Sequence, residues 1–144
     1  MAEFFSGQSE HTLDAKGRVI VPAKYRARFA DGAFLAKDKN RALALWTRTD
    51  YERQANQWLE KLESEDPDLV KQAKFWSASV EEVTVDASTG RLTIPPKHRE
   101  HAQLEAGRPV VLNGAINHID VWNPAVYNER IAADAEAQFT GDAQ

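Results

Sequence analysis

The segment LDAKGRVIVPAKYR, Leu13 to Arg26, is the strongest indication of the fold, because a similar segment occurs later in the chain as VDASTGRLTIPPKHR, Val85 to Arg99. In register, the two copies share seven residues: Asp14/Asp86, Ala15/Ala87, Gly17/Gly90, Arg18/Arg91, Pro22/Pro95, Lys24/Lys97 and Arg26/Arg99. Each copy is followed by an apolar run that ends in a tryptophan, at Trp46 and at Trp122, with a tyrosine five residues later. The chain therefore contains one supersecondary unit twice.

Each copy predicts a β-hairpin, a short helix and a second β-hairpin. In the first copy, extended residues precede Asp14, Gly17 supplies the positive φ of a bend, and a β-rich run follows Arg18. Pro22 ends that run and suits the first turn of a helix, because its missing N–H would lack a partner there. The apolar runs on either side of residues 38–41 predict the second hairpin.

The second copy repeats this plan, and a helix is expected after each tryptophan. Thr49 or Asp50 can cap the first of these helices, Pro67 opens a further helical segment, and Asn123 precedes the helix of the second copy. We predict one α+β domain with the following limits: the whole chain at 1–144, repeat one at 8–53, a helical insertion at 54–78, repeat two at 79–130, and a disordered tail at 137–144.

Two similar units are expected to pack about a pseudo-twofold axis, because each unit alone exposes the apolar side of its short strands. Interleaving them would close one swapped-hairpin β-barrel with peripheral helices. Both bends would then emerge on one edge, and their basic side chains would form a single surface. The two tryptophans end apolar strands, so Trp46 and Trp122 are expected to pack in the core rather than stack on bases.

Composition limits the classes of function. The 144 residues include no cysteine, which excludes disulfides and thiolate metal sites. Residues 11–48 carry nine basic and three acidic residues, whereas the rest of the chain carries nine basic and 19 acidic ones. This asymmetry indicates a polyanion-facing surface on an acidic body, with a solvated face as the alternative. No leader and no run of about 18 apolar residues occurs, so we expect a cytoplasmic protein without a membrane segment.

No motif predicts catalysis or a cofactor. The spacing of His98 and His101 could supply two metal ligands, but no third is evident, and an ordinary surface pair is expected. The acidic stretch at 64–68 lacks the ligand spacing of a calcium loop and marks a helix boundary. Phosphate-binding loops and nucleophile motifs are missing as well. We therefore expect a protein that is not an enzyme and needs no metal or cofactor.

The two bend motifs and the tryptophans at the strand ends resemble the MraZ family, over nearly the whole chain. These are bacterial DNA-binding transcriptional regulators encoded with cell-division and cell-wall genes, related to AbrB-type swapped-hairpin proteins. The resemblance implies a nucleoid-associated protein whose single chain supplies two AbrB-like units. It also implies homo-oligomeric rings that bind double-stranded DNA at repeated boxes in the promoter of the family's own operon. The second bend departs from the family's pattern, because Arg91 follows Asp86 by five residues instead of four.

The predicted DNA contacts are Lys16, Arg18, Arg91, Lys24 and Arg26. The residues predicted to structure the turns are Asp14, Gly17, Asp86 and Gly90. An arginine at such a bend can bind a phosphate or form a bidentate pair with guanine, whereas a lysine at the apex suits the phosphate backbone. The acids repel phosphate and are expected to accept N–H bonds within the bend. The alternative for Asp14 and Arg18 is a salt bridge that only holds the turn. For Lys24, Arg26 and Arg28 on the short helix, a solvated face fits as well as contact with DNA.

A second class of function stays open, namely a non-enzymatic interaction module such as an antitoxin-like or scaffold protein. Its helices between Tyr51 and Trp76 would bind a partner protein. A toxin partner would call for a long disordered arm, and only about the last ten residues fit one. The same helices are candidates for ring contacts, or they cap their own barrel.

Overall fold

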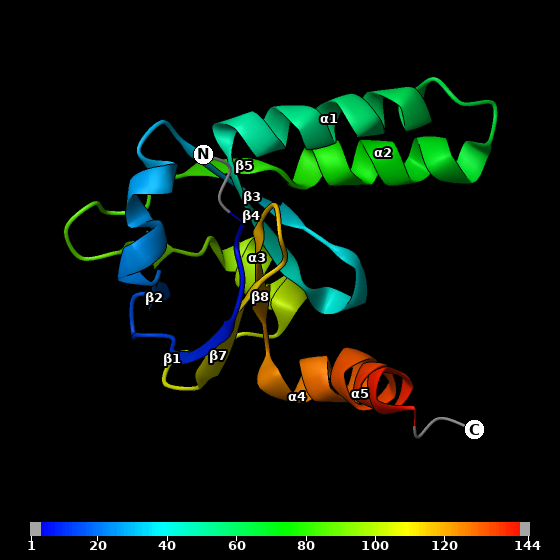
Figure 1. Cartoon of the computed structure of the whole chain (residues 1–144). Coiled ribbons are helices and arrows are strands. Elements are labelled where there is room, and N and C mark those ends of the chain that lie inside the picture. Colours follow the sequence, from blue (N-terminus) through cyan, green and yellow to red (C-terminus); the bar gives the residue numbers. More distant parts are fainter. Residues whose placement is uncertain (1–3, 142–144) are drawn as a thin grey trace.

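The computed structural model describes residues 4–141 (Figure 1). Its strands are β1 Gln8–Thr12, β2 Arg18–Ile20, β3 Ala33–Lys37, β4 Leu43–Thr47, β5 Glu81–Val83, β6 Arg91–Thr93, β7 Pro109–Gly114 and β8 Ile119–Trp122. Its helices are η1 Ala23–Phe29, η2 Lys39–Arg41, α1 Arg48–Leu62, α2 Pro67–Ser79, α3 Pro96–Ala102, α4 Pro124–Tyr127, η3 Asn128–Ala132 and α5 Ala133–Thr140. This is the mixed α+β architecture that the sequence predicts.

The strands form one six-stranded antiparallel sheet and one two-stranded ribbon. The order in the large sheet is β1-β7-β8-β4-β3-β5, and the ribbon consists of β2 and β6. Exchanging the equivalent strands of the two repeats leaves this order unchanged, since β1 corresponds to β5, β7 to β3 and β8 to β4. The pairing pattern therefore has the pseudo-twofold character expected of a duplicated unit.

The first predicted hairpin of each repeat differs from the observed pairing. The strand before the first bend, β1, pairs with β7, and the strand after it, β2, pairs with β6 of the other repeat. The strand β5 likewise pairs with β3 of the first repeat, but an isolated antiparallel bridge between Val85 and Leu92 joins the two arms of the second bend as predicted. Strands of three residues bury little surface alone, so pairing with the other repeat covers the apolar side of both. The second hairpins, β3–β4 and β7–β8, form as predicted.

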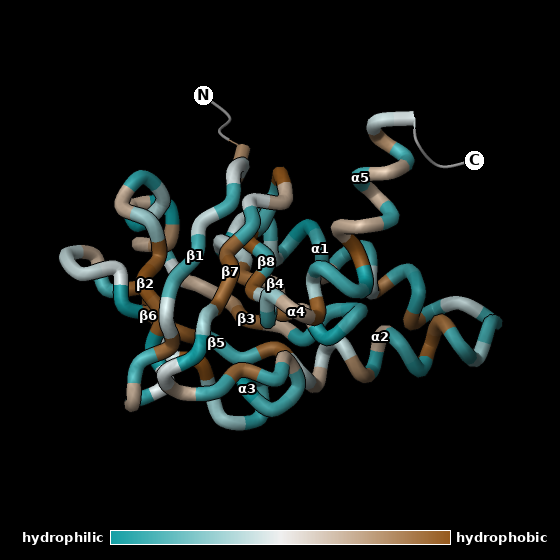
Figure 2. The backbone as a smooth tube through the Cα atoms, turned by 90° about the horizontal axis from the view of Figure 1, so that it is seen from below, coloured by the Kyte–Doolittle hydropathy of each residue, from teal (hydrophilic) through white to brown (hydrophobic). Residues whose placement is uncertain are grey.

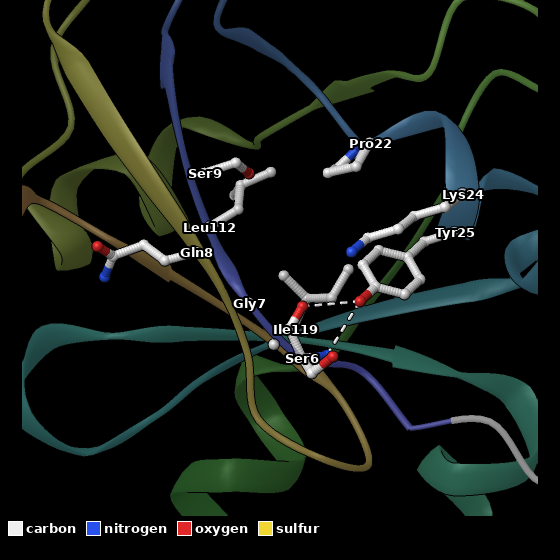
Figure 3. Close-up of a pocket in the computed structure, with 10 residues that line it drawn as sticks. Ser6, Gly7, Gln8, Ser9, Pro22, Lys24, Tyr25, Leu112 and Ile119 are labelled. Carbon is white, nitrogen blue, oxygen red and sulfur yellow. Dashed lines mark hydrogen bonds between the residues drawn. The ribbon is translucent and has the colours of Figure 1, made fainter.

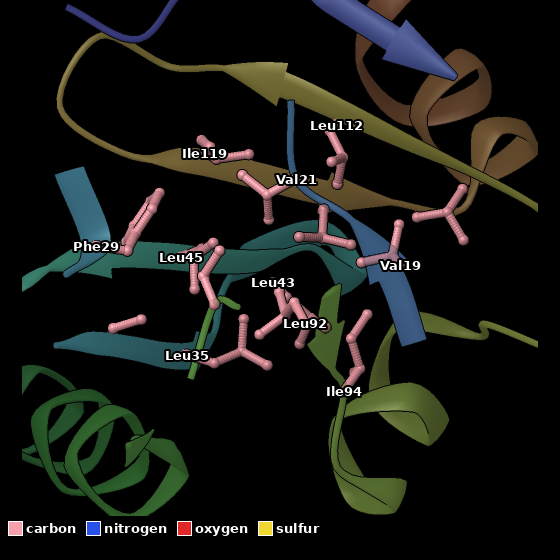
Figure 4. Close-up of a cluster of buried hydrophobic side chains, with 14 of the residues drawn as sticks. Val19, Val21, Phe29, Leu35, Leu43, Leu45, Leu92, Ile94, Leu112 and Ile119 are labelled. Carbon is pink, nitrogen blue, oxygen red and sulfur yellow. The ribbon is translucent and has the colours of Figure 1, made fainter. Parts of the chain in front are cut away.

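The two sheets share one hydrophobic core (Figure 4). Val19 and Leu92, which face each other in the ribbon, are both fully buried and lie in one cluster with Leu35 and Leu45 of the large sheet. Hydrophobic segments concentrate in β2, β6, β7 and β8, whereas α1 is mostly hydrophilic (Figure 2). Within residues 4–141, β1 and β5 remain edge strands and no strand pairing joins the sheet to the ribbon, so the pairings do not close a barrel.

The helices follow the predicted plan with shifted ends. Thr47 caps α1 by accepting the Asp50 N–H, so the helix begins before the predicted caps and well before the predicted insertion at 54–78. Asn123 caps α4 as predicted. The predicted disorder at 137–144 conflicts with α5, which is helical through Thr140, while 142–144 lie outside the described residues. No helix within residues 4–141 has the length and apolar character that crossing a membrane requires.

Burial decides the roles of the tryptophans and histidines. Trp46 and Trp122 are 4% and 5% exposed, which confirms the prediction of core packing. The expectation of a surface histidine pair is wrong, because His98 is buried and its Nε2 lies 2.7 Å from the Ser79 carbonyl oxygen. His101 Nε2 lies 3.0 Å from the Asp38 carbonyl oxygen. Both rings therefore tie α3 to other parts of the backbone.

Candidate nucleic-acid interface

The first bend, residues 14–18, is organised by the carboxylate of Asp14. Its Oδ1 accepts the backbone N–H groups of Lys16 and Arg18 at 2.9 and 2.8 Å, and its Oδ2 accepts Arg18 Nε at 2.7 Å. The Asp14 N–H donates to the Arg18 carbonyl, and the Gly17 N–H donates to the Asp14 carbonyl. The side chain of Arg18 is thus held by its Nε, which leaves its two terminal nitrogens outside this ion pair.

The second bend, residues 86–91, reaches the same closure with one more residue. The Asp86 N–H donates to the Arg91 carbonyl, and the Gly90 N–H donates to the Asp86 carbonyl. Asp86 Oδ1 accepts the N–H groups of Ser88 and Thr89 at 2.9 and 2.8 Å. The longer bend therefore supplies the Asp86 carboxylate with backbone donors from Ser88 and Thr89. Among residues 4–141, the Arg91 guanidinium has no hydrogen-bond or ion-pair partner.

The glycines of both bends adopt φ of +76°, a region that other residues rarely occupy. Each glycine also lies against an arginine from the short helix of the other repeat. Arg26 lies against Gly90, and Arg99 lies against Gly17, where an added Cβ would lie 2.8 Å from its Cζ. Arg26 also donates from a terminal nitrogen to the Ser88 carbonyl at 3.1 Å. The two bends are therefore braced across the repeat boundary.

The ribbon of β2 and β6 presents one face to solvent. Arg18 lies opposite Thr93, and Ile20 lies opposite Arg91, while the intervening Val19–Leu92 pair faces the core. Because side chains alternate along a strand, Arg18 and Arg91 belong to the same outer face and are diagonal neighbours. The Gly17 carbonyl accepts the Ile94 N–H and the Gly90 carbonyl accepts the Val21 N–H, which sets the bends at opposite ends of the ribbon. The two bends therefore do not emerge on one edge, contrary to the expectation from the sequence, but Arg18 and Arg91 still share one face of the ribbon.

The remaining predicted contacts lie elsewhere. Lys16 is exposed at the first bend. Lys24 points toward Tyr25 and Ser6 over a small hollow between η1 and the N-terminal segment, and its Nζ lies 4.9 Å from the Tyr25 ring centre (Figure 3). Arg26 is half-buried and braces the second bend through Val21 and Ser88. The five residues therefore divide into three at the bends or ribbon and two on η1.

The prediction omitted several residues of this surface. Arg99 donates from Nε to the Ile94 carbonyl at 2.9 Å, just as Arg26 donates to the Val21 carbonyl at 3.0 Å. The repeat alignment contains the signal for this role, because Arg26 and Arg99 are aligned identities. Ile20 and Thr93 on the outer face carry no such signal, since only the strand pairing reveals that they flank the arginines.

One group of possible metal ligands lies outside the bends. Asp38, His118 and Asp120 place ligand atoms within 4.8 Å of one another. His118 Nε2 already lies 2.7 Å from Asp120 Oδ1, and its ring stacks on Trp46 with centres 4.3 Å apart. These contacts give His118 a packing role at the end of β4.

Hydrogen bonds within the bends lower the pKa of both carboxylates, Asp14 and Asp86, and so favour their charged state. The Arg18 N–H, with the Arg18 guanidinium and the Lys16 N–H, holds the pKa of Asp14 below its ordinary value. The Thr89 N–H, with the Ser88 hydroxyl and N–H, holds the pKa of Asp86 well below its ordinary value. A carboxylate with a depressed folded-state pKa stabilises the fold above its unfolded pKa of about 4, and this contribution is lost as pH falls toward the folded value.

We therefore expect the free energy of unfolding to fall as pH decreases below about 4. Asp86→Asn should flatten this acid dependence more than Asp14→Asn, because the folded-state pKa of Asp86 is lowered further than that of Asp14. Urea unfolding at a series of pH values from neutral to acid measures the effect. An Asp86→Asn protein with the same acid profile as the parent would contradict the assignment.

Comparisons with known proteins match almost the whole chain. Residues 4–72 and 78–144 match the family model described as "MraZ protein, putative antitoxin-like". The protein called transcriptional regulator MraZ from Thermoanaerobacter pseudethanolicus is 33% identical over 123 residues, covering 85% of this chain and 83% of its own. The one from Corynebacterium kroppenstedtii is 30% identical over 138 residues, covering 96% and 94%. The one from Paenarthrobacter aurescens is 33% identical over 141 residues, covering 94% and 92%.

Proposed function

The chain belongs to the MraZ family, and on that premise we propose that it is a sequence-specific DNA-binding transcriptional regulator that reads DNA with the outer face of the β2–β6 ribbon. The observation that carries the proposal is the position of Arg18 and Arg91 on one solvent-exposed face of a two-stranded ribbon. The major groove of B-DNA admits a two-stranded ribbon, and arginine pairs with the edge of guanine there. The role requires no catalysis.

The two arginines would act differently. The bond from Arg18 Nε to Asp14 limits the positions of that guanidinium, so less freedom is lost when its terminal nitrogens bind a base or phosphate. Arg91 has no such restraint and suits a more adaptable contact. Lys16 at the bend, and Lys24 and Arg26 on η1, remain predicted contacts to the phosphate backbone. Arg26 braces the second bend as well.

Assembly would compensate for the acidic body of the protein. The formal net charge is -4, so a single copy offers DNA only a local basic surface. We propose that copies assemble into a ring, which lets several ribbons contact repeated boxes in the promoter of its own cell-division and cell-wall operon and raises the overall affinity. The swapped-hairpin barrel belongs to this proposal as the scaffold of the ribbon, supported by the core that both sheets share. Such a protein would be associated with the nucleoid.

Fluorescence anisotropy of labelled duplexes tests the proposal. A duplex from upstream of the protein's own gene should bind in preference to a scrambled duplex of equal length at physiological salt. Arg18→Ala and Arg91→Ala should each weaken binding to the native duplex by about tenfold to 100-fold, since a bidentate arginine–guanine pair contributes about 1–3 kcal/mol of discrimination. Arg130→Ala removes an exposed arginine from η3 and is the matched control, expected to change little.

Two further results discriminate between the roles. Lys16→Ala should weaken binding to both duplexes alike and reduce the salt dependence by about one ion, as loss of a phosphate contact does. Equal, weak binding of native and scrambled duplexes by the folded protein would overturn sequence-specific reading. In that case the interaction-module hypothesis would gain weight, and the α1–α2 helices would become the first surface to test for protein partners.

A further inference from the structure

A groove lies between the α1–α2 hairpin and the segment that joins β3 to η2, and we call it the α1–α2 groove. Its lining includes the aromatic residues Trp58, Phe75 and Trp76 and the lysines Lys37, Lys39 and Lys71, here called the rim lysines, and its volume is about 490 Å³. The rings of Trp58 and Trp76 stack with centres 5.8 Å apart. Phe75 is 57% exposed, so its ring is available for contact. The volume falls in the range of real binding sites, which are mostly apolar with a few polar groups.

The charge of the groove indicates what it binds. Three of its lining residues are lysines and one, Asp38, is an acid, in a protein whose overall charge is -4. Lys61 adds a further cation, with its Nζ 4.1 Å from the centre of the Trp58 ring. A groove with this composition suits an acidic segment that also carries an aromatic side chain.

The C-terminal helix α5 has that chemistry. Its first turn carries Asp134 and Glu136, and the ring of Phe139 is 93% exposed, more than any other large apolar side chain among residues 4–141. Glu136 and Phe139 are three residues apart and therefore share one face of the helix. An aromatic residue so exposed beside an acid is typical of an anchor that a partner surface covers.

The groove and α5 lie far apart within one chain. Figure 1 draws α1 and α2 at one end of the molecule and α5 near the other, with part of the sheet between them. A contact between them must therefore join two copies. Because the two surfaces are different, the contact is head-to-tail, and repetition of a head-to-tail contact produces a ring when the rotation closes.

We infer that α5 of one copy docks into the α1–α2 groove of a second copy, with Phe139 against the groove's aromatic residues and Glu136 near the rim lysines. This inference deepens the ring assembly proposed above and rests on it. It assigns the groove to a second copy of this chain rather than to a foreign protein.

Cysteine cross-linking tests the contact directly, because the chain has no cysteine of its own. A protein with Gln72→Cys in the groove is mixed with a differently tagged protein carrying Ala135→Cys, one turn before Phe139 on the same helix face, and the mixture is unfolded, refolded and oxidised. We expect a mixed disulfide-linked dimer, since disulfides form only where Cα atoms approach within about 7 Å. Ala106→Cys, an exposed alanine elsewhere, replaces Ala135→Cys in the control and should yield none.

Light scattering during size-exclusion chromatography supplies the second test. Phe139→Ala should weaken assembly about 30-fold or more, as truncation of an anchoring aromatic does, whereas Phe4→Ala, which removes another exposed phenylalanine, should not. Lys71→Glu and Glu136→Lys should each weaken assembly, and the protein with both changes should regain it. A Phe139→Ala protein with the parent's mass, or a parent that is monomeric, would overturn the inference.

The outcome can be separated from that of the proposed function. Phe139→Ala should keep the weak binding of a duplex with a single box and lose the gain in affinity that tandem boxes provide. Loss of single-box binding in Arg18→Ala with unchanged assembly tests only the DNA-reading proposal. If the protein prefers the native duplex but forms no cross-link, the docking of α5 is contradicted and the DNA-reading proposal stands.

Discussion

Gly90→Ala is expected to lower the free energy of unfolding by about 3 kcal/mol or more. The residue has φ of +76°, and a side chain in this region costs about 1–2 kcal/mol. In addition, the new Cβ would lie 2.6 Å from the carbonyl oxygen of Val21 and close to Arg26 Nε, and the N–H of the same Val21 donates to the Gly90 carbonyl at the end of the ribbon. Backbone cannot move aside without disturbing the pairing of β2 with β6. Urea or guanidinium unfolding measures the loss.

Gly17→Ala is the matched comparison. Gly17 has the same φ, but the three atoms nearest to its added Cβ all belong to the guanidinium group of Arg99, at 2.8 to 3.0 Å. That side chain can rotate away, so the expected loss is about 1–2 kcal/mol, the cost of the backbone conformation alone. Equal losses for the two substitutions would show that the contact with the Val21 carbonyl does not restrict the second bend.

Leu92→Ala is expected to destabilise the protein by about 3 kcal/mol, within the range of about 2–5 for a buried leucine. Leu92 is fully buried and lies opposite Val19 in the ribbon, so its loss leaves a cavity between the ribbon and the large sheet. Chemical unfolding again measures the effect. The ribbon should also lose rigidity, which native-state hydrogen exchange of β2 and β6 would detect as faster exchange.

Ile20→Ala is the control for this prediction, because it truncates the neighbouring outward position of the same ribbon. Ile20 is 37% exposed, and its loss should cost less than about 1 kcal/mol. If Ile20→Ala destabilised the protein as much as Leu92→Ala, the outer face of the ribbon would be covered in solution, and it would not be free to meet DNA. The pair of variants therefore also tests the accessibility on which the proposed function depends.

Much of the local structure could be predicted from single stretches of sequence. The hairpins β3–β4 and β7–β8 were recognisable from apolar runs around polar turns, and their register follows from short loops. Asn123 and Pro67 marked helix starts by their own chemistry. The prediction of the α1 cap was wrong because Thr47, itself the last strand residue, accepts the Asp50 N–H, and hydroxyl residues at neighbouring positions are equally suited to capping.

The candidate site divides in the same way. The motif predicted that Asp14 and Asp86 accept N–H groups within their bends, and both do so. It could not indicate that Arg18 is held by Asp14 while Arg91 is not, because this depends on which donors the extra residue of the second bend brings to Asp86. Nor could it distinguish Arg26, which braces a bend of the other repeat, from a residue on a solvated face.

The amino-acid sequence was enough to identify a duplicated unit with two glycine bends, two hairpins and a cluster of basic residues in one part of an acidic protein. The pairing of β2 with β6 across the repeats, which puts Arg18 and Arg91 on one face, became evident only in the folded protein. The β-propensity of a strand depends on a few neighbouring residues and is similar in both copies, so it does not select a pairing partner. The choice between pairing within a repeat and pairing across repeats depends instead on how much apolar surface each arrangement buries, which is a property of the whole core.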